Sequence, residues 1–600
     1  MTDDDQEIEF WADKLAKNMV LRNKFNYSNK KSNPNKDNYS IKSSTSISGV
    51  PHIGNASDVF RAEAVVNALK DLGKKVHFFW VGEDMDNLRK VPAGIPVSFK
   101  KYLGQPVSEI PCPENCCDSY AEHFENLFIN SLKDQFGVEV KFYSMKKEYY
   151  AGNFYELIKI ALKNRNQIRD ILNSFRDPSR PLVKNWMPWE PVCENCGKII
   201  TTKMLDIHDD CETVEYVCQD YQFEHALIKG CNYKGTSEIK KGHGKLPWKV
   251  EWAAQWKRWN VDFEPFGKEH GVNCPRVLGV SKIGAGSFWV AGNISESVYE
   301  YPEPCPTVEP NVIQPYEYVL IGNEKMSASK GNTIATWDWP NFAPPETLRL
   351  FFLKKPKSQS NIMTIKKIGN NYRLIDKEFD IQGLIDEIDE LAEVYFGIME
   401  LEEDAEKIKI KKRLYEICMN DKIPEDVPRR IPFKYAIIMC QLNDILSPEK
   451  IMENAIEVVK KKYVVEELTD IDIREIRLGL DRAAHWVKKF APTNIIIRIS
   501  KEIDENFVKT INKNQIDALT QFKEDFSQRI WDEDSIQNYI FKLGKNVVGN
   551  VKKTFQLFYK ILINKKYGPR LGPFLLSLDK DWIIDRIEKA MKIYDEKMRE

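Results

Sequence analysis

The chain has 600 residues, of which 42% are hydrophobic and 11% aromatic, and its 88 basic and 89 acidic residues give a net charge of −1. Six hundred residues are too many for one hydrophobic core, so we expect several domains. No apolar run approaches the roughly 20 residues that span a bilayer. The acidic start Met-Thr-Asp-Asp-Asp is unlike a secretion or transit signal. We therefore expect a cytoplasmic protein, and the balanced charge neither supports nor excludes RNA as a partner.

The chain opens with a short amphipathic pattern followed by a polar stretch. Residues 7–20 place Phe10, Trp11 and Leu15 among charged residues, which predicts an opening helix. Residues 23–40 are rich in Asn, Lys and Ser, which is typical of a surface loop. We therefore treat residues 1–42 as an N-terminal helix and polar loop.

A strand, a tight turn and a helix are predicted over residues 43–70. Small hydroxyl residues come first, then Gly49 and Pro51, then apolar residues at helical spacing. This order puts His52 and Asn55 at or near a helix N-terminus, where free N–H groups and the helix dipole favour a phosphate. Gly49 and Gly54 have no Cβ, so a flat ring can approach the backbone there. A lone histidine more often has a structural role, so a phosphate site here would need a second phosphate-binding motif elsewhere in the chain.

The segment Glu324-Lys-Met-Ser-Ala-Ser-Lys-Gly-Asn332 offers that partner. Two lysines flank two serines in a small loop that ends in glycine. Ammonium groups neutralise a triphosphate, while hydroxyl and N–H groups bond its oxygens. Such a loop on its own would be read as a solvated surface segment.

Carboxylates follow a predicted buried strand. Residues 75–81 are apolar and aromatic, which favours a parallel strand, and Glu83, Asp84 and Asp86 come directly after it. Ligands bind at the carboxyl edge of such sheets. Three carboxylates there are costly unless they hold a cation. The ε-ammonium of lysine and Mg²⁺ are the candidates, and an ion pair with Arg89 or Lys90 is the structural alternative.

Several of the twelve cysteines are spaced as metal ligands. A tetrahedral Cys₃His zinc site is predicted within a dozen residues, because a disulfide between adjacent cysteines would be awkward; its ligands are Cys112, Cys116, Cys117 and His123.

A second zinc site is predicted from Cys193 and Cys196, which are followed by Gly197 as in a zinc-knuckle turn. Cys218 and Cys231 are candidates for the two remaining ligands, and Cys211 is an alternative to either.

Downstream, four tryptophans at offsets of four and three share one face of a predicted helix, which by default indicates core packing; they are Trp248, Trp252, Trp256 and Trp259. From residue 374 onward, amphipathic helical patterns dominate over residues 379–401, 435–446, 453–464, 471–490 and 579–598.

In this order, the segments at 52–55 and 325–330 resemble the HIGH and KMSKS signatures of class I aminoacyl-tRNA synthetases. Longer matches resemble the archaeal-type class I lysyl-tRNA synthetases, at residues 81–92, 119–124, 245–248, 261–270 and 325–332. The resemblance runs with gaps from Trp11 to about Phe352 and continues more faintly to the C-terminus.

This resemblance implies an α/β fold, with a Rossmann-type doubly wound catalytic domain over residues 43–360. The domain carries a zinc-bearing insertion at about residues 100–245, and an all-α anticodon-binding region follows over residues 361–600. The implied reaction is the ATP-dependent attachment of L-lysine to tRNA(Lys) through a lysyl-adenylate, with ATP, Mg²⁺ and Zn²⁺ as cofactors. We expect a monomer without membrane contact.

The resemblance also assigns roles. ATP phosphates are held by His52, Asn55, Lys325, Ser327, Ser329 and Lys330. The rest of ATP is held by Gly49, Gly54, Gly267, Glu269, His270 and Met326. Lysine is held by Ser44, Thr45, Asp84, Asp86, Trp252 and Trp256. Asp84 or Asp86 is preferred to Glu83 for the ammonium, because the family usually has Ser-Asp-Asp-x-Asp here and Glu83 departs from it. For the second zinc site the resemblance favours Cys218 and Cys231 over Cys211, because each keeps the flanking residues that the family has.

Two alternatives stay open. A glutamyl- or cysteinyl-type class I synthetase would share both signatures, and the glutamyl kind should aim an arginine at the substrate's side chain. A synthetase-derived RNA-binding or regulatory protein without catalysis should have a degraded phosphate clamp, whereas His52, Lys325 and Lys330 are all present.

Overall fold

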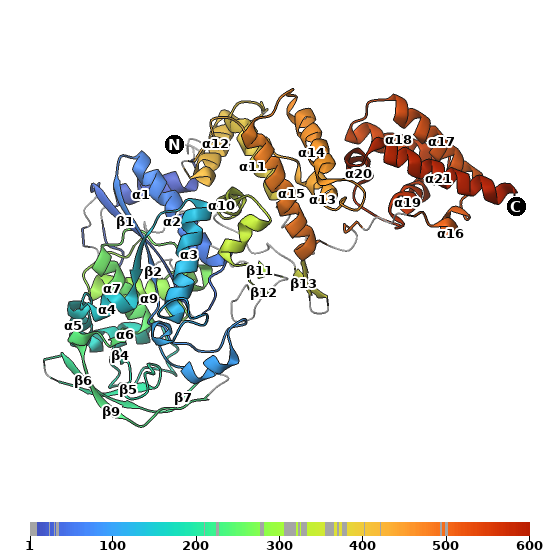
Figure 1. Cartoon of the computed structure of the whole chain (residues 1–600). Helices are drawn as coiled ribbons and strands as arrows, with labels where there is room; N and C mark the ends of the chain where they lie inside the picture. Colours follow the sequence, from blue (N-terminus) through green and yellow to red (C-terminus); the bar gives the residue numbers. More distant parts are fainter. Residues whose placement is uncertain are drawn as a thin grey trace. The chain divides into compact units, whose positions relative to one another are not determined.

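The computed structural model of the chain describes residues 9–599, apart from residues 23, 29, 32–34, 48, 209, 224–226, 276–280, 305–319, 322–323, 326–332, 355–364, 369–370, 375–380, 401, 421, 492–494 and 498–501. The chain forms two compact units. Unit 1 comprises Met1–Trp339, Pro345–Ile362 and Glu400–Ile423, and unit 2 comprises Pro340–Pro344, Met363–Met399 and Pro424–Glu600. Each is described by itself (Figure 1).

A parallel sheet forms the centre of unit 1. Its strands are β1 (Asn38–Thr45), β2 (Lys75–Gly82) and β3 (Lys141–Ser144), in the order β1-β2-β3. The crossovers carry α2 (Ile53–Asp71) and α3 (Tyr120–Phe136). Beyond β1, Ile41 forms a single parallel bridge with Phe263. The predicted strand at residues 75–81 is confirmed. The strand expected from residue 43 begins earlier, at Asn38, so most of it lies in the stretch that we treated as a polar loop.

Helices cover both faces of this sheet. On one face, Trp80 packs against Phe128 of α3 with ring centroids 5.3 Å apart. On the other face, Phe79 packs against Trp259 at the end of α7 (Trp248–Trp259), at 5.4 Å. Successive residues of a strand point to opposite faces, so β2 anchors one helix layer with each of these two neighbouring residues. The predicted α/β arrangement with helices on both faces is confirmed.

A small antiparallel region follows in the chain. Its strands are β4 (Glu190–Pro191), β5 (Thr202–Ile207), β6 (Thr213–Cys218), β7 (Tyr221–Gln222), β8 (Leu227–Ile228), β9 (Lys234–Glu238) and β10 (Gly244–Lys245). They form a β5-β6-β9 sheet and the pairs β4–β10 and β7–β8. The second cysteine group lies in this region. The first lies earlier, in the connection between β2 and α3, so the two groups belong to different parts of unit 1.

The remaining elements of unit 1 are mainly short helices. They are α1 (Trp11–Leu21), α4 (Met145–Tyr150), α5 (Tyr155–Lys163), α6 (Arg165–Ser174), α8 (Lys268–Gly271), α9 (Ser287–Ser297), α10 (Pro345–Leu353), α12 (Ala405–Met419) and the hairpin β11 (Leu320–Ile321)–β12 (Glu324–Lys325). The 3₁₀ turns are η1 (Val97–Tyr102), η2 (Val107–Glu109), η3 (Ile239–Lys241) and η5 (Thr336–Asn341), the last of which ends in unit 2. The helices α5 and α6 follow one another directly and meet at Asn164.

The helix α12 returns to unit 1 from beyond the predicted domain boundary at residue 361. Its Arg413 forms ion pairs with Asp13 of α1 and Asp71 of α2. In α10, Arg349 is buried and pairs with Glu63 of α2. These pairs connect α10 and α12 to α2, the helix that follows β1. The predicted single boundary at residue 361 therefore does not describe unit 1, which also includes residues 400–423.

Unit 2 is helical apart from the hairpin β13 (Ile365–Ile368)–β14 (Asn371–Leu374). Its helices are α11 (Ile381–Tyr395), α13 (Phe433–Met439), α14 (Pro448–Tyr463), α15 (Asp470–Phe490), α16 (Glu505–Val508), α17 (Lys513–Gln528), α18 (Glu533–Asn546), α19 (Val551–Ile563), α20 (Leu571–Ser577) and α21 (Lys580–Arg599). The prediction of a helical C-terminal part is confirmed. Across the described parts of the chain, no helix is both long and apolar enough to cross a bilayer.

Candidate active site

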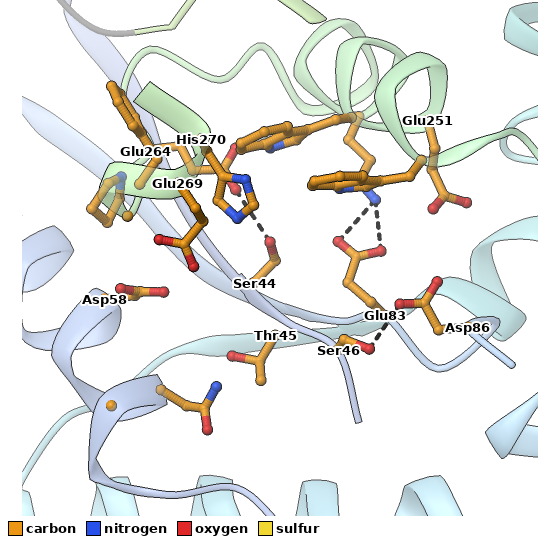
Figure 2. Close-up of a pocket in the computed structure, with 18 of the residues that line it drawn as sticks. Ser44, Thr45, Ser46, Asp58, Glu83, Asp86, Glu251, Glu264, Glu269 and His270 are labelled. Carbon is orange, nitrogen blue, oxygen red and sulfur yellow. Dashed lines mark hydrogen bonds between the residues drawn. The ribbon is translucent and has the colours of Figure 1, made fainter. Parts of the chain in front are cut away.

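A cavity of about 570 Å³ lies at the carboxyl ends of β1 and β2. Its walls come from the residues after these strands, the first turns of α2, one side of α7 and the segment from Glu264 to His270. The lining contains six carboxylates and, among the described residues, one arginine: Asp58, Glu83, Asp86, Glu251, Glu264, Glu269 and Arg89. Figure 2 shows Glu83, Asp86 and Glu251 at one end, and Asp58 and Glu269 at the other.

The structure brings most of the predicted site residues together. Those that line the cavity are Ser44, Thr45, His52, Gly54, Asn55, Asp86, Trp252, Gly267, Glu269 and His270. Gly49, Asp84 and Trp256 are not among the lining residues. The positions Met326, Ser327, Ser329 and Lys330 lie outside the described residues, and Lys325 is described only as backbone in β12.

The start of α2 is organised by His52 and Asn55. The backbone N–H of Gly54 donates to His52 Nδ1 at 3.1 Å, and the backbone N–H of His52 donates to Asn55 Oδ1 at 2.9 Å. This reciprocal cap defines where the helix begins, so Pro51 precedes the cap instead of occupying the first turn. Because Nδ1 accepts a hydrogen bond, the neutral ring carries its hydrogen on Nε2, which can donate to a ligand.

A distant part of the chain is joined to this helix start. His52 forms an antiparallel bridge with Ala335, and the backbone N–H of Ile53 donates to the carbonyl of Ile334 at 3.0 Å. Ile334 and Ala335 come shortly after the lysine-rich segment in the sequence, and that segment itself lies outside the described residues.

Asp84 faces away from the cavity. Its carboxylate accepts hydrogen bonds from Ser144 Oγ and, at 2.8 Å, from the backbone N–H of Lys146. Burial raises the pKa of Asp84 to about 6, although these hydrogen bonds oppose the shift. This carboxylate joins the end of β2 to the junction of β3 and α4. The preference for Asp84 over Glu83 as a cavity residue is therefore corrected: Glu83 lines the cavity and Asp84 does not.

Among the described residues, no ammonium or guanidinium group lies within hydrogen-bond distance of Glu83. Gln255 Nε2 donates to both of its oxygens at 3.1 Å. The nearest ammonium, Lys42 Nζ, is 4.0 Å from Oε1. Burial raises the pKa of Glu83 to about 8, while Lys42 acts in the opposite direction. The side chain thus offers an acceptor that would gain from an incoming positive charge.

Asp86 and Glu251, in contrast, share a buried ammonium. Lys245 Nζ lies 2.6 Å from Asp86 Oδ1 and 2.9 Å from Glu251 Oε2. Burial alone would lower the pKa of Lys245, but the two carboxylates raise it well above its usual value. Burial likewise opposes ionisation of Asp86, but Lys245 lowers the pKa of this carboxyl overall. This internal ion pair already satisfies the acids nearest to Glu83.

Glu264 is the most heavily hydrogen-bonded acid of the lining. Its Oε2 accepts from the indole N–H of Trp252 at 2.8 Å and of Trp256 at 2.6 Å. Its Oε1 accepts from Lys42 Nζ at 2.6 Å and from Ser44 Oγ at 3.2 Å. Trp256 thus supports the wall from behind. The sequence reading did not single out Glu264 or Lys42, although Glu264 stands within the matched segment at residues 261–270.

An aromatic wall completes the cavity. Trp248 and Trp252 stack with ring centroids 6.1 Å apart, and His270 meets their edges at 5.2 and 5.6 Å. Trp248 is 49% exposed, whereas Trp252 is buried. The inner indole is therefore placed to hold an aliphatic chain, and the outer one lies at the rim.

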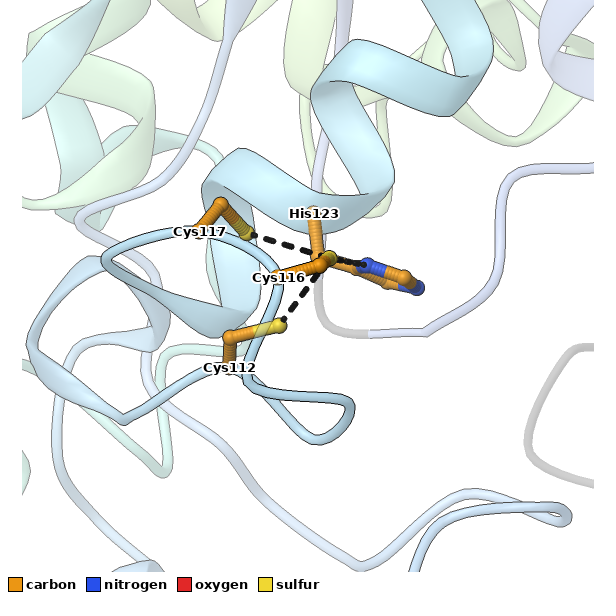
Figure 3. A group of neighbouring side chains, drawn as sticks. All are labelled: Cys112, Cys116, Cys117 and His123. Atoms are coloured by element: carbon orange, nitrogen blue, oxygen red, sulfur yellow. Dashed lines mark hydrogen bonds between the residues drawn. The ribbon is translucent and has the colours of Figure 1, made fainter.

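Two groups of metal-ligand side chains lie outside this cavity. In the first, shown in Figure 3, the four ligand atoms lie within 4.8 Å of one another; they belong to Cys112, Cys116, Cys117 and His123. Cys116 Sγ lies 3.6 Å from Cys112 Sγ, 3.9 Å from Cys117 Sγ and 3.1 Å from His123 Nδ1. Tetrahedral Zn–S bonds of about 2.3 Å place sulfurs roughly 3.8 Å apart, so the donor set fits zinc.

The second group has the same closeness and consists of Cys193, Cys196, Cys218 and Cys231. Cys193 and Cys231 are 3.6 Å apart, and Cys196 and Cys218 are 3.7 Å apart. The hairpin β7–β8 lies between the last two ligands and leaves their convergence intact. Cys211, the alternative ligand, is not part of the group.

Comparisons with known proteins agree with the sequence resemblance. The family tRNA synthetases class I (K) matches residues 9–421. The lysine–tRNA ligase of Methanocaldococcus jannaschii is 33% identical over 582 residues, which are 96% of this chain and 99% of that protein. The lysine–tRNA ligase of Methanosphaera stadtmanae is 31% identical, over 92% of this chain and 96% of that protein. The alignment with a solved glutamate tRNA ligase from Elizabethkingia meningosepticum covers 92% of this chain and 99% of that protein, at 12% identity. Its TM-score of 0.33 is too low to support a structural argument.

The raised pKa of Glu83 predicts a pH dependence of stability. Between its ordinary value of 4.5 and about 8, the folded state holds a proton that the unfolded state releases, so stability falls as pH rises. Relative to Glu83→Gln, the wild-type free energy of unfolding should decrease between about pH 7 and about pH 8, by at most about 1.4 kcal/mol. Urea denaturation at both pH values measures this. Asp84→Asn is the control, because its pKa of about 6 confines its effect to lower pH. An unchanged difference for Glu83→Gln would contradict the assignment.

Proposed function

Because the chain belongs to the class I (K) tRNA synthetases, we propose that it attaches L-lysine to tRNA(Lys) in a reaction driven by ATP. Relatives that are 33% and 31% identical over nearly the whole chain bear the name lysine–tRNA ligase. Lysine's carboxylate attacks the α-phosphate of ATP and pyrophosphate leaves, giving lysyl-adenylate. A ribose hydroxyl at the tRNA terminus then attacks the adenylate. Such a reaction depends on positioning and charge stabilisation more than on acid–base chemistry.

The choice of lysine rests on one observation, which is that Glu83 is bonded to the neutral amide of Gln255 and not directly to a cation. A partly buried carboxylate without a directly bonded cation is costly, and an ammonium that enters beside it supplies the missing charge. Asp86 and Glu251 already share Lys245, which makes them weaker candidates for a second ammonium. We therefore assign the substrate's ε-ammonium to Glu83, with Ser44 and Thr45 lining the same part of the cavity.

The aromatic wall suits the rest of the lysine side chain. A four-carbon stem can lie against the indole of Trp252, and an indole face also attracts an ammonium. A glutamate side chain fits this lining poorly, because six carboxylates surround the cavity and Arg89, which is exposed, is the one arginine among the described lining residues. The charge of the walls thus favours the lysine reaction over its glutamyl alternative.

The other end of the cavity suits ATP. The N-terminus of α2 presents the backbone of Gly54 and the side chains of His52 and Asn55, and helix N-termini favour phosphate. Glu269 can accept hydrogen bonds from the ribose hydroxyls, and Gly267 beside it leaves room for the ring. The segment carrying Lys325, Ser327, Ser329 and Lys330 is proposed to clamp the β- and γ-phosphates with Mg²⁺. The His52–Ala335 bridge supports this role, because Ala335 follows that segment closely in the sequence.

We propose that both cysteine groups hold structural zinc. Each offers four soft or borderline donors in one cluster, with no fifth position needed for chemistry. When bound, the metal would cross-link the connection before α3 in one case and the β5-β6-β9 region in the other. Action as a monomer in the cytoplasm stays a prediction.

The defining experiment is ATP–pyrophosphate exchange by the purified chain with each of the twenty amino acids, with and without tRNA. Lysine should drive exchange best, because only its side chain supplies a flexible primary ammonium to Glu83. Exchange driven best by glutamate or cysteine would replace the assignment with one of the related synthetases. No exchange with any amino acid, even with tRNA present, would favour an RNA-binding protein without catalysis.

Glu83→Gln should raise the KM for lysine roughly 30-fold or more, as expected when one partner of a buried charge pair is removed. The KM for ATP should change little. Asp84→Asn is the matched neighbour, because that carboxylate is also buried but binds Ser144 and Lys146 instead of lining the cavity. Steady-state exchange kinetics of both variants decide which acid receives lysine. A larger lysine defect in Asp84→Asn, or a defect rescued by excess Mg²⁺ in the ATP dependence, would overturn the assignment to Glu83.

Metal analysis tests the zinc proposal. Purified protein should contain two zinc ions per chain, and Cys193→Ser should lower the content to one because one thiolate ligand is lost. Elemental analysis gives the stoichiometry, and limited proteolysis should show new cleavage within residues 190–245. Cys211→Ser is the control, because this buried cysteine belongs to neither group. One zinc in the wild type, or an unchanged content in Cys193→Ser, would remove the second site.

A further inference from the structure

A lysine of the chain itself is buried behind the cavity wall. Lys42 lies in β1 and its side chain has no exposed surface. Lysine is almost never fully buried unless it is paired. Its ammonium lies 2.6 Å from Glu264 Oε1 and 2.9 Å from Ser44 Oγ. This group is chemically identical to the side-chain ammonium of the proposed substrate.

Lys42 stands between two carboxylates of the cavity. Its Nζ is bonded to Glu264 and lies 4.0 Å from Glu83. Glu264 is fully engaged, because its second oxygen accepts both indole N–H groups. Glu83 is bonded to the neutral amide of Gln255 instead. Of these two acids, one is thus occupied by an internal ammonium and the other is open.

We propose that Lys42 is a positioning and specificity-determining residue, which occupies the ammonium site at Glu264 so that the substrate's ammonium has one site, at Glu83. This inference rests on the proposed lysine reaction. The cavity contains two neighbouring carboxylates that can each hold a lysine side chain, and the chain supplies one of the two. With Glu264 closed, the distance from the bound ammonium to the reacting carboxylate of the substrate has a single value, which selects for side-chain length.

Other charges around Glu83 do not provide this selection. Lys245 is held by Asp86 and Glu251 on the opposite side, at 2.6 and 2.9 Å. Its carboxylate partners would have to be released before it could reach Glu83. Lys42 is therefore the internal ammonium whose partner decides which cavity acid stays open.

The first test uses Glu264→Gln alone and combined with Lys42→Met. Without its carboxylate partner, Lys42 should turn to Glu83, 4.0 Å away, and compete with the substrate. Glu264→Gln should therefore raise the KM for lysine about tenfold or more, with the KM for ATP unchanged. The double variant removes the competitor, so its KM for lysine should return to within about threefold of the wild type. This recovery is a non-additive effect that independent structural damage does not produce.

The second test uses Lys42→Met alone, which opens Glu264 as a second acceptor. Lysine and its shorter homologue ornithine could then each place an ammonium at either acid. The ratio of the exchange rate with lysine to the exchange rate with ornithine should therefore fall about tenfold relative to the wild type. Arg349→Met is the control, because it also removes a buried cation, from its pair with Glu63, outside the cavity lining. That variant should lose stability without changing the ratio.

The outcomes separate the two proposals. If the wild type does not activate lysine, the proposed function fails before any variant is measured. If the wild type activates lysine but the double variant is as defective as Glu264→Gln, the inference about Lys42 alone is wrong. An unchanged lysine-to-ornithine ratio in Lys42→Met overturns it as well. Where Glu264→Gln does not fold, the ratio in Lys42→Met decides by itself.

Discussion

Charge neutralisation behind the cavity is the constraint on which the site depends. An ionised carboxylate is costly to bury, and six carboxylates line the cavity at the ends of β1 and β2. The chain meets this constraint with Lys42 and Lys245, which are both buried and both bonded to acids of the wall. Glu83 lies 4.0 Å from Lys42 and is not directly bonded to it. The same two lysines thus stabilise the fold and determine where an external cation can bind.

The opposite end of the cavity relies on backbone geometry instead of paired charge. The reciprocal cap of His52 and Asn55 sets the start of α2, and the bridge to Ala335 joins it to a part of the chain that lies far away in sequence. A phosphate site of this kind needs few side-chain charges of its own, because the helix N-terminus contributes N–H groups and a favourable dipole. Acidic and phosphate-binding regions can therefore share one cavity.

Features that depend on local spacing could be predicted from the sequence, and features that depend on tertiary contacts could not. The first cysteine group and the Cys193–Cys196 pair follow from ligand spacing. Cys218 and Cys231, which twelve residues separate, follow from the residues that flank them. The choice between Glu83 and Asp84 could not be made from the local sequence. Asp84 accepts a hydrogen bond from Ser144 of the neighbouring strand, which is 60 residues away in the chain. Likewise, the sequence does not show that Glu264 accepts hydrogen bonds from the indoles of Trp252 and Trp256, although the resemblance selects these two tryptophans. Domain boundaries were approximate for the same reason.

The return of α12 to unit 1 bears on how the chain is made. The sheet strands and α2 are synthesised early, but Arg413, which pairs with Asp13 and Asp71, leaves the ribosome only after α11, the first helix of unit 2. A nascent chain that has reached residue 360 carries the cavity residues described here, yet α10 still lacks its neighbour α12 and two acids lack their arginine. Unit 1 therefore cannot be completed strictly before unit 2 starts, and the two must mature during overlapping stages of synthesis.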